Sequence, residues 1–588
     1  MPPVRVLILG GGFAGIHAAK YLTAMLGKRT DVQVELISEE NYFVFQPLLP
    51  EVAAGGIAAT HVVNPIRELV PKARFRCCKI VQVDAANRQV LIAQGEGLEF
   101  VALPYDHLVF CLGKVTNFAS MPGVAEHALA MKDLGDAFKL RNHVIHCLEL
   151  ADIEANPAHK AALLSFVVAG GGFSGVETVG ELHELVMRSL KYFPRIMPSE
   201  VVFKLVHSQD RILPEMPESL GAAARRILEA RGIGMVLKAR VKAASRERVY
   251  LADGSHIATR TFVCTVGNAP NPIARQAMTE GGLPEAEANG KKLGLFLTDA
   301  TLQCVDSPGY WAVGDCAAIP NPNGPGFCPP TAQFAIRQAK TCATNVLAKI
   351  DGRPSVPFRF KALGMLASLG QRSAVAQMLG IELSGFVAWF VWRTIYLSKL
   401  PGFVRRLRVA LDWSLDLFFP RDITQMQLFR TDRLQVNHYE PGEIIVRQGQ
   451  VGRELYMIVR GEVEVLVPGP AGQPEVVVAK LGAREVFGEK ALLEDTKRTA
   501  TVRAAAAVDV LVMSRGDLRS LVGQFPVLDD YFAKLLRERM PSTFTQAQDL
   551  GQLLQAAEPG LVGELGLVEE PGLMGEHNEA GLPAAPRE

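Results

Sequence analysis

One glycine-rich pattern occurs twice in this chain, and the repetition limits the fold more than any other feature. The copies are GGGFAG at residues 10–15 and GGGFSG at residues 170–175, and each stands between a strand-like apolar run and a stretch with helical spacing. A strand, a glycine turn and a helix in this order predict a βαβ unit whose helix N-terminus receives a pyrophosphate. The sequence therefore predicts an α/β protein with two Rossmann-type domains and two dinucleotide sites.

The first copy has the residues that a phosphate-binding turn requires. Its glycines allow a tight turn, a close approach of the backbone to the pyrophosphate, and close packing of helix against strand. The expected contacts are Gly10, Gly12, Phe13, Ala14 and Gly15. Glu39 follows the second strand and is the candidate acceptor for a ribose hydroxyl, although Ser38 directly ends that strand and the acid comes one residue late.

The second copy departs from the usual pattern at its ribose position. Its expected contacts are Gly170, Gly172, Phe173, Ser174 and Gly175. The strand that normally ends in an acid ends in His207, and Arg211 lies nearby. A site without the acid and with an arginine close by accommodates a 2′-phosphate, so the choice between NADH and NADPH stays open.

Composition excludes several classes of partner and site. The 588 residues are 48% hydrophobic and 21% charged, which indicates several soluble domains, and a net charge of +1 gives no reason to expect a nucleic-acid partner. The N-terminus lacks the features of a secretory signal, so we expect a bacterial cytoplasmic location. Nine scattered cysteines predict free thiols and no metal site. No apolar run is long enough to span a bilayer, so any membrane contact is expected to be peripheral.

Several segments in order carry a family resemblance. They are GGGFAG, NYFVFQPLLPEVAAG at 41–55, LVFCLGKVTNF at 108–118, VVAGGGFSGVETVGEL at 167–182, DRILPEM at 210–216, TVGNAPNP at 265–272, YWAVGDCAAIP at 310–320 and TAQFAIRQAK at 331–340. Over roughly residues 3–430 the chain resembles the type II NADH:quinone oxidoreductases, which are non-proton-pumping flavoproteins. The resemblance implies an enzyme that takes hydride from NADH or NADPH onto FAD and passes electrons to a quinone.

The resemblance also implies roles for individual residues. Asp315 would reach the flavin ribityl chain, Gln46 and Pro47 would lie by the isoalloxazine, and Glu177 would be a proton relay near the nicotinamide. Further cofactor contacts are implied at Gly113, Gly267, Gly314 and Ala332. Gln333 and Gln338 would orient a quinone carbonyl. Arg337 replaces a glutamine of the family pattern, which leaves the identity of the quinone open.

A segment rich in tryptophan and arginine follows the α/β part. Residues 386–393 and 404–413 hold three of the four tryptophans, interleaved with Arg393, Lys399, Arg405, Arg406 and Arg408. This pattern predicts a helical surface on the cytoplasmic face of the inner (plasma) membrane, with tryptophan rings at the headgroup boundary and arginines on anionic lipid. An ordinary packing helix or a homodimer interface is the alternative.

The last part of the chain predicts a small all-β domain. Residues 434–540 resemble a cyclic-nucleotide-binding jelly roll, on the motifs YEPGEIIVRQGQVGRELYMIVRGEVEV at 439–465 and FGEKALLEDTKRTATV at 487–502. Glu489 would bind the ribose hydroxyl and Arg498 the cyclic phosphate, beside a short helix that begins near Gly488. Thr499 slightly favours cyclic GMP over cyclic AMP. Ligand binding is expected to shift residues 420–434 and change access to the quinone.

These patterns give a complete domain assignment. We expect FAD binding at 1–120 and 286–345, NAD(P)H binding at 121–285, the membrane-facing segment at 346–430, the cyclic-nucleotide domain at 431–540 and a disordered tail at 541–588. Two other functions remain open. One is a sulfide:quinone-type oxidoreductase, for which Cys328 is the only cysteine expected near the reacting centre; the other is a flavoprotein nucleotide sensor in which His207 prevents hydride uptake.

Overall fold

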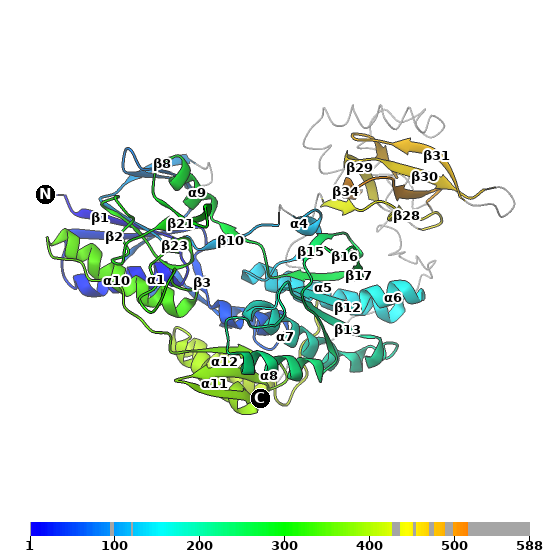
Figure 1. The fold of residues 1–588 in the computed structure, drawn as a ribbon, viewed down its shortest axis with the longest axis horizontal. Helices are drawn as coiled ribbons and strands as arrows, with labels where there is room; N and C mark the ends of the chain where they lie inside the picture. Colours follow the sequence, from blue (N-terminus) through cyan, green and yellow to red (C-terminus); the bar gives the residue numbers. More distant parts are fainter. Residues whose placement is uncertain are drawn as a thin grey trace, which may run out of the picture. The chain divides into compact units, whose positions relative to one another are not determined.

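The chain folds into two compact units, each described by itself. The computed structural model describes residues 2–94, 99–118, 121–425, 435–450, 454–469, 475–488 and 498–514. The first unit comprises residues 1–431 and 436–440, and the second comprises residues 432–435 and 441–588. The first unit is mixed α/β and the second is β-rich (Figure 1). The predicted combination of a Rossmann-type α/β part and a separate β domain is confirmed.

A five-stranded parallel sheet forms the centre of the first half of unit 1. Its strands, in spatial order, are β22 (Tyr310–Ala312), β9 (His107–Phe110), β1 (Val4–Leu9), β2 (Val32–Ser38) and β5 (Arg74–Cys77). Helices α1 (Phe13–Leu26) and α10 (Ala332–Ile350) pack side by side next to this sheet (Figure 1). Because β22 and α10 come from the region after residue 300, this half is built from two separate stretches of chain.

The second half repeats the same arrangement with residues from the middle of the chain. Its parallel strands are β11 (Ala128–Leu129), β18 (Thr261–Cys264), β12 (Ser165–Ala169), β13 (Val202–Val206) and β14 (Ile233–Val236). Helices α5 (Leu134–Ile153), α7 (Phe173–Ser189) and α8 (Glu218–Glu229) pack against it. Every residue of β12 is buried, as expected for a parallel strand covered on both faces.

A third element of unit 1 follows the two halves in sequence. It consists of the antiparallel strands β24 (Gly364–Ser368), β25 (Ala374–Met378) and β26 (Ile381–Gly385), then helices α11 (Phe386–Lys399) and α12 (Phe403–Leu415). The turn after β24 lies directly on α7, because a Cβ added at Gly180 would lie 2.3 Å from the Leu369 carbonyl oxygen. This module therefore covers the second half at close range.

Unit 2 is a sandwich of two antiparallel sheets. One contains β28 (Ile444–Val446), β33 (Thr501–Ala504), β30 (Val463–Val467) and β31 (Val476–Leu481), and the other contains β34 (Val508–Ser514), β29 (Glu454–Arg460) and β32 (Val486–Phe487). Glu489 and the predicted tail at 541–588 lie outside the described residues. Within the residues described, no helix has the length and apolar character needed to cross a membrane.

Candidate functional site

The two glycine turns have the same backbone geometry. Gly10 and Gly170 both have positive φ angles, 109° and 121°, which only glycine adopts without strain. Each donates its N–H to a carbonyl at the end of the neighbouring strand, Gly10 to that of Ile37, next to last in β2, at 2.8 Å and Gly170 to that of Val206, the last residue of β13, at 2.9 Å. The sequence repeat is therefore a structural repeat, with a cradle at the carboxyl end of each central strand.

Both cradles are closed on one side and open on the other. A Cβ added at Gly15 would lie 1.8 Å from the Gly10 carbonyl oxygen, and one at Gly175 would lie 1.8 Å from the Gly170 oxygen. By contrast, a Cβ at Gly12 would meet no atom within 4 Å among the described residues, and one at Gly172 would meet only Glu215 Oε1, at 3.7 Å. The closed side lets helix and strand touch, and the open side leaves the helix N-terminus accessible to a pyrophosphate.

The strand ends that would read a ribose carry no carboxylate in either cradle. Ser38 lies against the first cradle, since a Cβ at Gly11 would be 2.5 Å from its Oγ, and Glu39 is exposed one residue farther on. In the second cradle the His207 ring takes the place of Ser38, 2.6 Å from a Cβ built at Gly171. Both guanidinium ends of Arg211 donate to carbonyls of its own loop, those of Met216 and Pro214, at 3.1 and 2.7 Å.

The candidate flavin residues of the later stretch surround a small cavity. Asp315 lies in the single turn Gly314–Cys316, directly after β22. The Gly314 N–H donates to Oε1 of Gln338 on α10 at 3.0 Å, so the buried Gln338 side chain fixes this turn. Both residues and Asp315 line a cavity of about 40 Å³ together with Lys114 and Cys328. The turn at Asp315 and the start of α10 are thus brought together.

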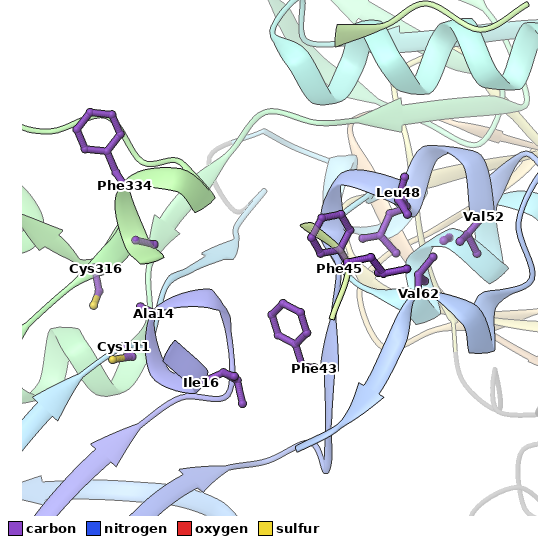
Figure 2. Close-up of a cluster of buried hydrophobic side chains, with 14 of the residues drawn as sticks. Ala14, Ile16, Phe43, Phe45, Leu48, Val52, Val62, Cys111, Cys316 and Phe334 are labelled. Atoms are coloured by element: carbon purple, nitrogen blue, oxygen red, sulfur yellow. The ribbon is translucent and has the colours of Figure 1, made fainter. Parts of the chain in front are cut away.

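An aromatic wall lies beside the first cradle. Phe13 packs edge-on against Phe43 and Phe45, with ring centroids 4.9 and 5.8 Å apart. Figure 2 shows Phe45 on the side of the buried residues Leu48, Val52 and Val62. The predicted flavin neighbours Gln46 and Pro47 follow directly in the turn Gln46–Leu48, and Gln46 Nε2 donates to the Lys132 carbonyl at 3.3 Å.

The remaining glycines of the prediction occupy turns that exclude a side chain or favour glycine. Gly113, Gly267 and Gly314 all have positive φ angles. A Cβ at Gly267 would lie 2.7 Å from the Asn117 carbonyl oxygen, where the antiparallel strands β10 (Lys114–Thr116) and β19 (Asn268–Pro270) connect the two halves. These positions follow from backbone packing in the structure.

The start of α10 holds the two glutamines differently from one another. Ala332 begins the helix. The side-chain amide of Gln333 makes two hydrogen bonds at the start of β24: it donates to the Gly364 carbonyl at 3.1 Å and accepts from the Leu363 N–H at 3.3 Å. Gln338 is engaged with Gly314. Arg337, the departure from the family pattern, stacks over the Phe360 ring at 5.5 Å.

Glu177 is a buried acid on α7. Its Oε1 accepts from the Ser368 N–H at 3.1 Å. Burial raises the pKa of Glu177 to about 8, with further increases from Glu181 and Glu51, while the Ser368 bond opposes them. Below pH 8 this carboxyl therefore carries a proton in a water-poor position, which suits a proton donor.

Residues that the sequence interpretation missed surround Glu177. Tyr396 is close enough for Glu177 to raise the pKa of its hydroxyl, after the larger effect of burial, and its ring packs against Phe45 and Trp392 at 6.1 and 4.7 Å. Ser368 joins Glu177 to Glu181, to which its hydroxyl donates at 3.2 Å. In the sequence, the only sign that these residues act together was the spacing of Trp392 and Tyr396 by one helical turn.

A cluster of buried charges continues from Glu177 along α7. Glu181 and Glu184 lie on the same helix face, and burial raises the pKa of Glu181. Arg421, itself buried, pairs with Glu181, Glu184 and Asp416 at 3.3, 3.3 and 3.2 Å. The chain after α12 is therefore fixed to α7 by ion pairs that water does not screen.

Comparisons with known proteins agree with this geometry. Residues 4–340 match the pyridine nucleotide-disulphide oxidoreductase family, residues 363–422 match the NDH2 C-terminal domain, and residues 436–525 match the cyclic nucleotide-binding domain. The type II NADH:quinone oxidoreductase Ndh of Mycobacterium tuberculosis is 31% identical over 446 residues, covering 73% of this chain and 92% of that relative. The chain belongs to the type II NADH:quinone oxidoreductase family.

Two other relatives support the same assignment. The demethylphylloquinone reductase NdbB of Synechocystis is 30% identical over 70% of this chain and 95% of the relative. The structure of NDH2 from Plasmodium falciparum in complex with NADH has a TM-score of 0.64 at 18% identity, over 72% of this chain and 99% of that one, and shows the shared fold. The predicted membership and the enzyme class, a non-proton-pumping NADH dehydrogenase, are confirmed.

The placement of the tryptophans in this family member differs from the prediction. Trp389, Trp392 and Trp413 are all buried, and the Arg393 guanidinium lies between two of their rings, 4.2 Å from Trp389 and 4.6 Å from Trp413. The expectation that these rings lie at a headgroup boundary is wrong, because they are buried and two of them pack on the partly buried Arg393, which also faces Glu51 at 4.0 Å. The exposed apolar residues of α11, α12 and the chain after them are instead Phe386, Val387, Phe390, Phe403, Val404, Leu407, Leu411, Leu415, Leu417, Phe418 and Phe419.

The β domain places its predicted arginine in a closed arrangement. Arg498 donates to the carbonyls of Gly488 and Glu454 at 3.2 and 2.9 Å, and lies over the Tyr456 ring at 5.6 Å. Thr499 is exposed beside it. Glu489, the predicted ribose ligand, falls outside the described residues, so the pairing of that acid with Arg498 stays a prediction.

Proposed function

We propose that this chain takes hydride from NADH or NADPH onto FAD and passes the electrons to a quinone, with FAD in the first cradle and the reductant in the second. FAD, when bound, supplies the hydride acceptor and the route for electrons to the quinone. The observation that carries the proposal is the presence of two cradles with one backbone geometry inside a single compact unit. The protein's own task is to hold the two dinucleotides so that the reductant and the flavin face each other within reach of hydride transfer.

The first cradle fits FAD in its charge and shape. Gly12 leaves the N-terminus of α1 open, which favours a pyrophosphate. Asp315, held by the turn that Gln338 fixes, would bind the ribityl chain, and Gln46 and Pro47 would border the isoalloxazine. We assign FAD binding to residues 1–120 and 286–345 and reductant binding to residues 121–285.

Glu177 would supply a proton for quinone reduction. A quinone takes up two protons with two electrons, and a carboxyl that is protonated below pH 8 is suited to donate one of them. Tyr396 and Phe45 would form the apolar border of this position. Gln333 and Gln338 already bond to backbone groups, so they would act on a quinone only through remaining hydrogen-bonding capacity.

Flavin bleaching tests the proposal directly. The purified chain is expected to be yellow, and NADH or NADPH should bleach it without oxygen, after which a quinone should restore the colour. Bleaching by sulfide alone would point to the sulfide:quinone alternative, and no bleaching by any reductant would contradict the proposal. Burial raises the pKa of Cys328, the cysteine expected near the reacting centre, which makes its thiol a poorer nucleophile for the sulfide chemistry.

We also propose that α11 and α12 rest on an anionic membrane surface, at its cytoplasmic face. Phe403 and Phe418 are 79% and 81% exposed, and Arg406 and Arg408 are exposed on the same helix as Phe403. Apolar side chains with neighbouring cations suit a boundary with acidic lipid. The double variant Phe403→Ser/Phe418→Ser should lose flotation with vesicles that contain phosphatidylglycerol.

Phe100 provides a matched control for membrane binding. It is 71% exposed on β8 (Glu99–Pro104), which belongs to a separate three-stranded sheet and is distant in sequence from α11 and α12. Phe100→Ser should leave flotation unchanged. Equal losses in the two variants would contradict the assignment, as would dimerisation that depends on Phe403 and Phe418 in the absence of vesicles.

A cyclic nucleotide is the proposed ligand of the β domain, and quinone reduction its proposed target. Arg498 would exchange its bonds to the Gly488 and Glu454 carbonyls for the cyclic phosphate. The segment after α12 is bound to the charge cluster through Arg421, and Arg141 donates to the Asp422 and Thr424 carbonyls at 2.7 and 2.9 Å. A displacement of this segment would therefore change the ion pairs of the carboxylates near Glu177.

Ligand titration tests this regulation. Cyclic AMP or cyclic GMP should bind the chain and change the rate of quinone reduction, and Arg498→Lys should weaken both effects. Arg460→Lys, an exposed change on β29, should alter neither. Thr499→Ala should reduce the affinity for cyclic GMP only. Binding without any change in rate or in membrane flotation would contradict the regulatory role.

A further inference from the structure

We propose that His207 reads the adenosine ribose of the reductant, and that its uncharged ring lets the second cradle accept NADH and NADPH with similar affinity. This rests on the proposed function, because it requires the second cradle to hold the reductant. The inference names the residue that sets the choice of substrate at that site.

The position of His207 is the one from which a ribose is read in this type of fold. Val206 pairs with Ala169, the last residue of the central strand, so His207 is the first residue beyond the sheet, next to the cradle. The ring lies against Gly171, where an added Cβ would be 2.6 Å from the ring carbon Cγ. An acid at the end of this strand normally accepts hydrogen bonds from the ribose hydroxyls of NADH.

The hydrogen bond from Gly171 orients the ring and fixes its charge. The Gly171 N–H donates to His207 Nδ1 at 3.1 Å, so Nδ1 carries no proton and the neutral ring carries its proton on Nε2. Burial lowers the pKa of His207, opposed by Glu215, which agrees with a neutral imidazole. The ring therefore presents one donor and no charge.

The donor that remains has nothing to bind within the protein. His207 Nε2 is buried and has no hydrogen-bond partner among the described residues. A buried polar atom without a partner costs free energy unless a ligand or water satisfies it. A ribose oxygen, or an oxygen of a 2′-phosphate, would satisfy it equally well once the ring turns enough to uncover Nε2, because both accept hydrogen bonds.

The His207 position itself neither repels nor specially attracts a 2′-phosphate. A carboxylate at this position would repel the phosphate, and His207 removes that repulsion. Arg211 is not a dedicated phosphate ligand, because both of its terminal nitrogens donate to the Met216 and Pro214 carbonyls. Glu215 is exposed, with its Oε1 3.7 Å from a Cβ built at Gly172, on the pyrophosphate side of the cradle. The site is therefore permissive.

The test measures binding with ligands that carry no hydride. Titration calorimetry on the flavin-loaded full-length chain compares ADP-ribose with 2′-phospho-ADP-ribose. The two dissociation constants should agree within about tenfold for the unmodified chain and for His207→Gln, which stays uncharged. His207→Glu should favour ADP-ribose by roughly a hundredfold, because it restores the repulsion of the phosphate.

A second acidic variant separates position from charge. Ser208→Glu places the same charge on the exposed neighbouring residue and should shift the ratio much less. Equal shifts in His207→Glu and Ser208→Glu would overturn the assignment of His207, as would a hundredfold preference in the unmodified chain. If neither ligand binds and neither NADH nor NADPH bleaches the flavin, the proposed function itself fails.

Discussion

The helices that follow the two cradles start alike and then carry different chemistry. After equivalent glycines, α1 places His17 and Tyr21 on the face where α7 places Glu177 and Glu181. The α1 pair are ring neighbours, with centroids 6.2 Å apart, and His17 bonds to the Phe13 carbonyl within its own helix. The α7 pair are buried acids that bond to Ser368.

This difference shows which part of a duplicated fold is fixed and which is free. The cradle is set by backbone contacts, so both copies keep glycines at the same places and the same bonds to the next strand. The helix face beyond the first turn has no such constraint. In the second half this helix face packs against the element formed by β24–β26, α11 and α12. It carries buried carboxyl groups next to the proposed proton-transfer position.

Loss of Arg421 should have the largest effect, because it acts on the half that carries buried acids. Arg421→Met would remove the cation that pairs with Glu181, and would leave Glu184 and Asp416 with Arg188 alone. Removing one partner of a buried ion pair costs about 3–5 kcal/mol. The free energy of unfolding of the full chain, measured in urea by the fluorescence of the tryptophans, should fall by that amount.

Two further variants keep this prediction testable. Arg421→Lys retains the charge and should recover part of the stability, even if the Met variant does not fold. Arg408→Met changes an exposed arginine of α12 and should alter stability by less than about 0.5 kcal/mol. Equal effects of Arg421→Met and Arg408→Met would show that the cluster is not a source of stability.

An alanine substitution in one cradle should weaken the binding of one dinucleotide only, and the lost ligand should differ between the two cradles. A Cβ at Gly15 or Gly175 would lie 1.8 Å from a backbone oxygen, so each cradle must open, at a cost of about 3 kcal/mol. Gly15→Ala should release FAD with roughly a hundredfold loss of affinity, whereas Gly175→Ala should keep the flavin and weaken NADH binding by a similar factor.

Flavin absorbance and ADP-ribose titration measure the two losses. Gly232→Ala is a suitable control, since that turn glycine has open space around its Cβ position among the described residues and lies outside both cradles, although its positive φ angle of 87° adds local strain. Loss of flavin in both cradle variants would contradict the assignment of one dinucleotide to each cradle.

Replacement of Glu177 should affect only the step that consumes protons. Glu177→Gln is expected to slow quinone reduction by about a hundredfold, the lower end of general acid catalysis, and to leave flavin reduction by NADH unchanged. Since the pKa of Glu177 is raised to about 8, the acid form is present below pH 8 and disappears above it. The quinone half-reaction should therefore slow as pH rises through 8, and this fall should vanish in the variant.

Stopped-flow traces of the two half-reactions check this prediction. Glu184→Gln is a useful comparison, because Glu184 lies two turns farther along α7 and accepts from Gln371 N–H at 2.7 Å. It should keep the fall near pH 8. A Glu177→Gln chain with an unchanged pH profile would remove Glu177 from the proton route and leave only its structural bond to Ser368.

The sequence predicted the cradles well because their cause is local. Positive φ at Gly10 and Gly170 and close contacts at Gly15 and Gly175 involve residues within one turn of chain, so a short motif contains the whole requirement. The family resemblance also implied a role for Glu177, and that role stays a prediction. A short motif could not predict that the pKa of Glu177 is raised, because the burial that raises it comes from β24 and the elements after it, nearly two hundred residues later in the sequence.

The positions of the tryptophan rings in α11 and α12 were predicted wrongly for the same reason. Composition placed tryptophan and arginine at a lipid boundary, but Arg393 lies between Trp389 and Trp413, whose helices meet only in the folded chain. Trp413 also donates to Glu51, which lies in α2 (Leu49–Ala53), at 2.5 Å. Residue types alone do not distinguish a cation that packs between aromatic rings inside the fold from one at a lipid interface.

The smallest expected effect concerns the ribose position of the first cradle. Ser38 lies on Gly11, while Glu39 is exposed, so an acid at residue 38 would face the ribose and the acid at residue 39 contributes little. Ser38→Asp should tighten FAD retention by roughly tenfold, the value of one hydrogen bond to a charged acceptor, and Glu39→Gln should change it by less than about threefold. The rate of flavin release into excess apo-acceptor, followed by fluorescence, measures both. A large loss in Glu39→Gln would mean that the backbone turns on FAD binding to bring Glu39 inward, and the two cradles would then differ in how they read a ribose.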